Sequence, residues 1–197
     1  MSILSILENY MITESLGIVY HATDLESAVN IVRTGCFYMS NSDRLPGDIS
    51  TERELSNNKK YYFSTMRSSS PFLFLRGQHI AEDNIVTFEL DYDYLRRKFK
   101  SYAVNYGYED MDDWSEDMES EERFVSDTVK KICDIENFVN VIHIYTSDDY
   151  DEEYYIDFGK MIEQSNMKVL FYITTQSYVV RKKGMTLDEY TSYVNEE

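Results

Sequence analysis

The sequence predicts an α+β fold, and three observations predict it. Several segments are rich in aromatic and β-branched residues, as strands are. Other segments repeat apolar residues at helical spacing. The two kinds do not alternate regularly, which disfavours a doubly wound parallel sheet. The strand-like segments are Tyr61–Thr65, Asn84–Leu90, Val139–Tyr145 and Val169–Thr174.

The clearest predicted helix is Leu25–Val32. Its apolar residues recur at helical spacing, Thr23 and Glu26 form a capping-box pattern before it, and Gly35 ends it. A short alternating strand, centred on Phe37 and Met39, follows. Further helical patterns cover Tyr92–Lys100, Tyr154–Asn166 and Leu187–Val194.

Length and composition indicate one domain over residues 1–197. The chain has two prolines and seven glycines, and no linker-like stretch divides it. No apolar run approaches the length of a membrane span and no signal-peptide pattern opens the chain, so we expect a soluble, cytoplasmic protein without a membrane partner. Cys36 and Cys133 lie in apolar surroundings and are expected to be free, buried thiols.

The net charge of the chain limits the kinds of partner that it can bind. Thirty-six acidic residues against nineteen basic ones give a net charge of −17, which opposes tight non-specific binding to nucleic acid. Acidic residues crowd 109–122 and 148–153. Such runs are usually solvated surface. A more specific alternative is mimicry of nucleic acid, in which the carboxylates imitate phosphates and bind a basic partner.

The polar segment Asn41–Lys60 is predicted to be a long loop that is suited to act as a lid.

Three short elements carry candidate chemistry, and they follow one another in a fixed order. They are Tyr20-His21-Ala22-Thr23 before the first helix, Tyr61-Tyr62-Phe63-Ser64-Thr65-Met66-Arg67-Ser68 at a strand end, and Glu119-Ser120-Glu121-Glu122-Arg123-Phe124 after the acidic stretch. Each alone is weak, because a lone histidine is more often a core or capping residue.

Together, the three elements resemble the ADP-ribosyltransferase superfamily, whose members carry a His or Arg on the first core strand, a Tyr or Ser-Thr-Ser element later, and then a catalytic Glu. A closer likeness is to the DarT-type DNA-modifying toxins and related phage-encoded proteins. The resemblance spans about residues 19–124. It implies a split, mixed or antiparallel sheet with flanking helices, and NAD as the substrate that donates ADP-ribose.

The resemblance also implies roles. Glu121, the second acid of Glu-x-Glu, would be the catalytic carboxylate, with Glu119 and Glu122 as alternatives. Arg67 would orient the NAD phosphate or the acceptor. The cofactor-binding candidates are His21, Thr23, Tyr62 and Ser64. A carboxylate suits this chemistry because cleavage of the nicotinamide–ribose bond passes through an oxocarbenium-like state that a negative charge stabilises.

Mono-ADP-ribosyl transfer to a macromolecule, or NAD hydrolysis, is therefore the leading hypothesis. On charge grounds a protein acceptor is favoured over nucleic acid. The alternatives are a non-catalytic acidic protein that blocks a basic partner, and a transferase fold that has lost turnover. No metal is implied, because His21, His79 and His143 lack partners at ligand spacing. His79 and His143 read as ordinary strand or loop residues.

Overall fold

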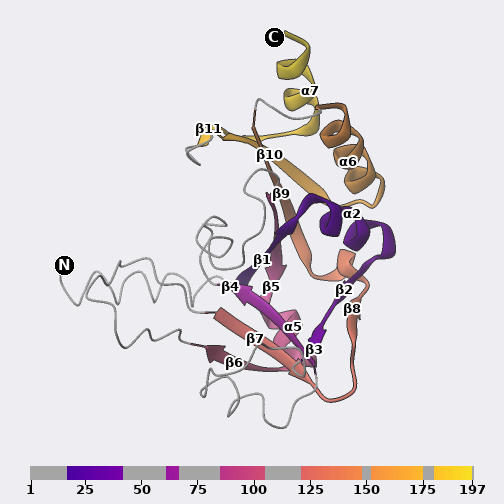
Figure 1. The fold of residues 1–197 in the computed structure, drawn as a ribbon, viewed down its shortest axis with the longest axis vertical. Coiled ribbons are helices and arrows are strands. Elements are labelled where there is room, and N and C mark those ends of the chain that lie inside the picture. The colour runs from indigo at the N-terminus through magenta and orange to yellow at the C-terminus, as the bar shows by residue number, and fades with distance from the viewer. Residues whose placement is uncertain are drawn as a thin grey trace, which may run out of the picture.

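The computed structural model describes residues 17–41, 61–66, 85–104, 121–147, 152–174 and 180–196. These residues form a nine-stranded sheet in the order β11-β10-β9-β5-β1-β4-β7-β6, with β3 beside β4, and a separate ribbon of β2 and β8 (Figure 1). The strands are β1 Ile18–Asp24, β2 Cys36–Tyr38, β3 Ser40–Asn41, β4 Tyr61–Met66, β5 Ile85–Asp91, β6 Lys100–Val104, β7 Glu121–Ser126, β8 Lys131–Cys133, β9 Val139–Ser147, β10 Lys168–Thr174 and β11 Val180–Met185.

Pairing in the large sheet is antiparallel except between β9 and β10, which run parallel with α6 between them in sequence. The helices are α2 Leu25–Thr34, α5 Tyr92–Lys98, α6 Glu152–Gln164 and α7 Leu187–Glu196, and a 3-10 turn covers Ile135–Asn137. The mixed, mostly antiparallel sheet with separate helices confirms the predicted α+β class.

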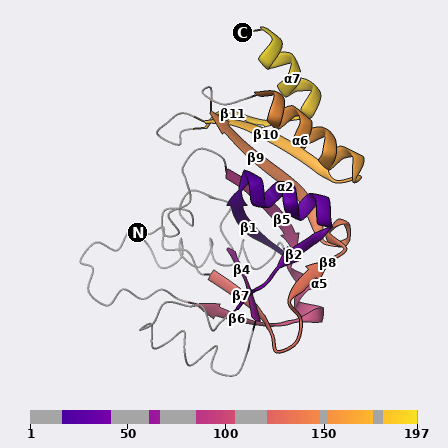
Figure 2. The ribbon, with the colours of Figure 1, turned by 45° about the vertical axis from the view of Figure 1, so that its right-hand side comes forward.

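The two faces of the large sheet differ. One face joins α2, α6 and α7 in the main core, which includes Val19, Phe63 and Phe88 from the strands and Phe158 from α6. Figures 1 and 2 show α2 and α6 lying along this face. The other face carries a smaller cluster of Ala22, Met66, Ile85 and Tyr145, against which Tyr20 and Tyr172 pack. Alternation along each strand sends neighbouring residues to opposite faces.

The helix α2 begins one residue later than its capping pattern predicts. Asp24, rather than Thr23, is the N-cap: its carboxylate accepts from the backbone N–H of Ser27 at 2.7 Å. Asp is as good a cap as Thr, and here Thr23 remains in β1. The helix ends as predicted at Gly35, whose φ of 65° is the left-handed conformation that glycine adopts without strain.

The cysteines contradict the prediction of free thiols. Cys36 of β2 lies directly opposite Cys133 of β8, and the two form a disulfide across 97 residues of sequence. Sequence spacing could not reveal this pair, because the antiparallel β2–β8 ribbon is what brings the two positions together. The bond ties the segment after α2 to the segment after β7.

Other predicted elements are confirmed with small shifts at their ends: the strands β4, β5, β9 and β10 and the helices α5, α6 and α7. The strands β6, β8 and β11 were not predicted. The predicted lid over residues 41–60 falls, except for its first residue, outside the described residues. Within the described residues, no helix is long and apolar enough to cross a membrane.

Candidate active site

The three elements singled out in the sequence lie on three adjacent strands. His21 and Thr23 belong to β1, Tyr62 and Ser64 to β4, and Glu121 begins β7. The sheet order places β4 between β1 and β7. Residues about 100 positions apart in sequence are thus brought onto neighbouring strands in the half of the sheet that ends at β6.

One row of backbone partners runs across these strands. Tyr20 of β1 pairs with Met66 of β4, and Met66 pairs with Glu121 of β7. Among the described residues, β1 and β4 share only this pair, whereas β1 and β5 pair along all seven residues of β1. The sheet is therefore most weakly joined between β1 and β4, where the candidate residues meet.

The His21 side chain adds a hydrogen bond between β1 and β4, where the backbone pairing is sparse. Its Nδ1 lies 2.9 Å from the carbonyl oxygen of Ser64. Because a carbonyl oxygen only accepts, Nδ1 carries the proton and donates. Burial lowers the pKa of His21, against the opposing effect of the Ser64 hydrogen bond. The neutral imidazole then has an unprotonated Nε2, which accepts hydrogen bonds rather than donating them.

The His21 ring lies on the helix-covered face. It contacts Phe37 edge-on with ring centroids 5.4 Å apart, and Phe63 at 4.7 Å. Thr23, two residues further along β1, is also buried, with 8% of its surface exposed. These contacts place His21 and Thr23 within the packing between β1 and the aromatic core.

Tyr62 and Ser64 alternate with Phe63 and so occupy the opposite face of β4. The guanidinium carbon of Arg123 lies 4.8 Å above the Tyr62 ring, and Ser64 is paired with Arg123 across the strands. Arg123 is 8% exposed. This arginine was not singled out for a role from the sequence, yet it brings a fixed positive charge beside Tyr62.

The three candidate glutamates differ in position. Glu122 is 3% exposed, and its Oε1 accepts from the Tyr92 hydroxyl at 3.1 Å on the helix-covered side. Glu121, the first residue of β7, pairs with Met66 of β4. Glu119 and Arg67 lie outside the described residues. Of the three glutamates, Glu122 is therefore the one that the structure shows buried and hydrogen-bonded.

His143 was expected to be an ordinary strand or loop residue, and it lies within β9. Its Nδ1 lies 2.9 Å from the Tyr172 hydroxyl and its Nε2 lies 3.4 Å from Glu89 Oε2. These side chains come from β9, β10 and β5. Only the pairing of the three strands, which sequence spacing does not give, brings them together.

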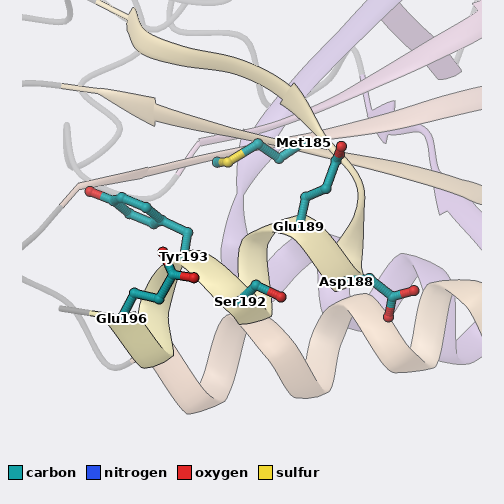
Figure 3. Close-up of a pocket in the computed structure, with 6 residues that line it drawn as sticks. All are labelled: Met185, Asp188, Glu189, Ser192, Tyr193 and Glu196. Atoms are coloured by element: carbon teal, nitrogen blue, oxygen red, sulfur yellow. The ribbon is translucent and has the colours of Figure 1, made fainter.

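A hollow lies far along the sheet from these strands. Figure 3 shows the residues that line it beside α7: Met185, Asp188, Glu189, Ser192, Tyr193 and Glu196. Its volume is about 370 Å³. Glu189 also caps α7, since its Oε2 accepts from the backbone N–H of Thr186 at 2.8 Å. Three carboxylates make this hollow unsuited to the pyrophosphate of a dinucleotide. Within the described part of the chain, no group of three His, Cys, Asp or Glu residues is arranged to hold a metal ion.

No family model and no curated protein matches the chain. Among solved structures it is similar to that of Thermus sp. 2.9 DarT in complex with ADP-ribosylated single-stranded DNA. The identity is 11%, the match covers 78% of this chain and 92% of that chain, and the TM-score is 0.48. At that level the likeness carries no argument about activity, so a functional assignment has to rest on the residues of this chain.

Proposed function

We propose that this chain cleaves NAD and transfers ADP-ribose to a macromolecular acceptor, with Glu121 as the catalytic carboxylate. The observation that carries the proposal is the row Tyr20–Met66–Glu121, which sets the three candidate elements on adjacent strands at the weakest join of the sheet. The three elements are spread over about 100 positions of sequence. They can form one site only if they lie on adjacent strands, and unrelated strand segments would have no reason to do so.

The proposed chemistry assigns each group a task. Glu121 stabilises positive charge on the ribose as nicotinamide leaves, and it assists deprotonation of the nucleophile that attacks the anomeric carbon. Tyr62 supplies an aromatic surface for the nicotinamide ring, and Ser64, on the same face of β4, contributes a hydrogen bond. His21 and Thr23 lie on the opposite, helix-covered face, so His21 is a positioning residue that holds the Ser64 backbone through its carbonyl oxygen.

The pyrophosphate of NAD needs positive charge in a protein whose net charge is −17. Arg67 is the candidate implied by the resemblance. Arg123 is a second candidate, because it is held over Tyr62 on the strand that begins with Glu121. A planar guanidinium donates two parallel hydrogen bonds to a phosphate, which a lysine does not.

The acceptor is proposed to be a protein. An acidic surface attracts a basic polypeptide over about a Debye length and repels a phosphate backbone. Labelled NAD incubated with the protein and a cell lysate separates the two cases. A labelled product that is lost on protease treatment supports a protein acceptor, whereas one lost on nuclease treatment contradicts it.

Nicotinamide release tests the proposal itself. We expect the wild type to release nicotinamide from NAD in the presence of lysate, and Glu121→Gln to lose this activity while keeping the fold. Glu163→Gln, at an exposed position of α6, is the matched control and should behave as the wild type. Equal turnover by Glu121→Gln and wild type would remove Glu121 from the mechanism.

The net charge favours one other function: a non-catalytic protein that occupies a basic partner by charge mimicry. Its acidic stretch at 109–120 lies outside the described residues. The two functions respond differently to mutation. Mimicry weakens gradually as many acids are neutralised and falls with added salt, whereas catalysis is lost with one carboxylate.

A further inference from the structure

A second cluster of polar and aromatic side chains lies on the sheet face opposite the helices. It is built on β10, β9, β5 and β1, which lie next to one another in the sheet in that order. Tyr20 pairs with Glu89 across β1 and β5, and Thr87 pairs with both Ala22 and His143. Residues paired directly across antiparallel strands share a face, so these side chains converge.

Glu89 is the charged centre of the cluster. His143 lies beside it, with Nε2 at 3.4 Å from Oε2, and 18% of the Glu89 side chain is exposed. Contact with His143 lowers the pKa of Glu89, burial opposes that effect, and Asn140 and Lys168 add to the lowering. The carboxyl group is therefore ionised at neutral pH and reaches the surface.

Tyrosines surround this carboxylate. Tyr172 stacks on Tyr145 with ring centroids 4.8 Å apart, and its hydroxyl contacts His143 Nδ1 at 2.9 Å. Burial raises the pKa of Tyr20 and of Tyr172, and the negative charge of Glu89 raises both further. The phenols thus stay neutral, and their hydroxyl oxygens lie within the field of the carboxylate.

The cluster leaves hydrogen-bonding capacity unused. Thr87, whose exposed surface is 1%, has a buried Oγ1 without a hydrogen-bond partner, and His143 Nε2 makes no hydrogen bond beyond its long contact with Glu89. Buried polar atoms in native proteins are nearly always paired. His143 Nε2 faces a carboxylate and therefore donates, whereas Thr87 Oγ1, on the same face of β5 as Glu89, has an unused acceptor. An unused acceptor near a carboxylate favours a ligand that donates hydrogen bonds.

We propose that Glu89, flanked by Tyr20 and Tyr172, binds the guanidinium group of an arginine side chain from a polypeptide partner. A guanidinium pairs with a carboxylate through two parallel hydrogen bonds and packs flat against aromatic rings. The protein's net charge of −17 draws a basic partner toward this face. A phosphate is excluded by the same carboxylate.

The arginine-binding site itself is inferred from these contacts alone. Its use as the subsite that receives a protein acceptor rests, in addition, on the proposed transferase function. Tyr20 links the two regions, since it pairs with Glu89 on one side and with Met66, in the row of Glu121, on the other. A segment rich in arginine that binds at Glu89 would then lie on the same sheet as the strands proposed to cleave NAD, beside them.

Calorimetric titration with N-acetyl-arginine amide tests the site, without NAD present. The neutral isostere N-acetyl-citrulline amide and N-acetyl-lysine amide are the ligand controls. We expect the arginine compound to bind, the citrulline compound not to bind, and the lysine compound to bind more weakly. Glu89→Gln should lower the affinity for the arginine compound at least tenfold, roughly the loss of one charge-assisted contact. Glu163→Gln should bind as the wild type.

Three results would overturn the proposal: no binding of the arginine compound at millimolar concentration, equal affinity in Glu89→Gln whose thermal unfolding matches the wild type, or equal affinity for the arginine, lysine and citrulline compounds. Because NAD is absent, failure here leaves the transferase proposal standing, and failure of NAD cleavage leaves the arginine site standing.

Discussion

His21 donates a hydrogen bond from Nδ1 to the carbonyl oxygen of Ser64 at 2.9 Å, joining β1 to β4 where the backbone pairing is sparse. Replacing His21 by Phe keeps a ring between Phe37 and Phe63 but removes this donor. We expect the free energy of unfolding at neutral pH to fall by about 1–3 kcal/mol. Urea unfolding followed by circular dichroism measures the change.

The His21→Phe variant also tests how the stability contribution of His21 depends on pH. Because burial lowers the folded-state pKa of His21 below 6.5, the unfolded chain takes up this proton first as the pH falls. The contribution of His21 is therefore fully present above pH 6.5 and is lost as the pH falls through the folded-state pKa. The stability difference between wild type and His21→Phe should shrink over that window. A constant difference across it would contradict the lowered pKa.

Glu122 is predicted to act in packing rather than in chemistry. Its side chain is 3% exposed and accepts from the Tyr92 hydroxyl, so Glu122→Ala leaves a cavity and removes this hydrogen bond. We expect a loss of about 1–3 kcal/mol in unfolding free energy. Tyr92→Phe, which removes the hydroxyl alone, should cost about 1 kcal/mol or less. Full stability of Glu122→Ala with abolished NAD cleavage would instead make Glu122 the catalytic acid.

The Cys36–Cys133 disulfide is predicted to be a major source of stability. It closes a loop of 97 residues, for which the chain-entropy model gives roughly 4 to 5 kcal/mol. Thermal unfolding with and without reductant should show a large drop in midpoint, and Cys36→Ala with Cys133→Ala should match the reduced wild type. Two reactive thiols in the unreduced, unfolded protein would show that the bond does not form.

Gly159 is predicted to be required for the approach of α6 to its neighbours. An added Cβ would lie 2.8 Å from Leu187 Cδ1 and 2.9 Å from Phe171 Cζ. Gly159→Ala should therefore destabilise by about 1–3 kcal/mol, despite the better helix propensity of alanine. Glu163→Ala, exposed on the same helix, is the control and should change stability little. A stabilised Gly159→Ala would mean that α6 packs less closely than described.

Periodicity in the sequence was enough to find most of the fold. The apolar spacing of Leu25–Val32 and the β-branched and aromatic runs of β9 and β10 reflect burial that local pattern records directly. The strand β6 was missed because its five residues, Lys100–Val104, carry little such pattern. The cap was assigned to Thr23 because both Thr23 and Asp24 are good caps, and only the path of β1 decides between them.

The candidate site residues could be identified from the sequence only where they form a short motif. His21, Tyr62 and Glu121 were each visible in a short motif, but that they lie on adjacent strands depends on sheet order. The disulfide and the cluster of Glu89, His143 and Tyr172 have no local signal, because long-range strand pairing alone creates them. Their discovery needs register, which a single sequence does not supply.

The central claim is that the strands β1, β4 and β7 bind and cleave NAD, and one paired titration tests it most directly. NAD is titrated into the wild type and into Glu121→Gln by calorimetry, and nicotinamide release is followed in the same samples with lysate added. The account predicts that both proteins bind NAD and that only the wild type releases nicotinamide. Absence of NAD binding in both proteins would contradict the account and favour the acidic-mimic function.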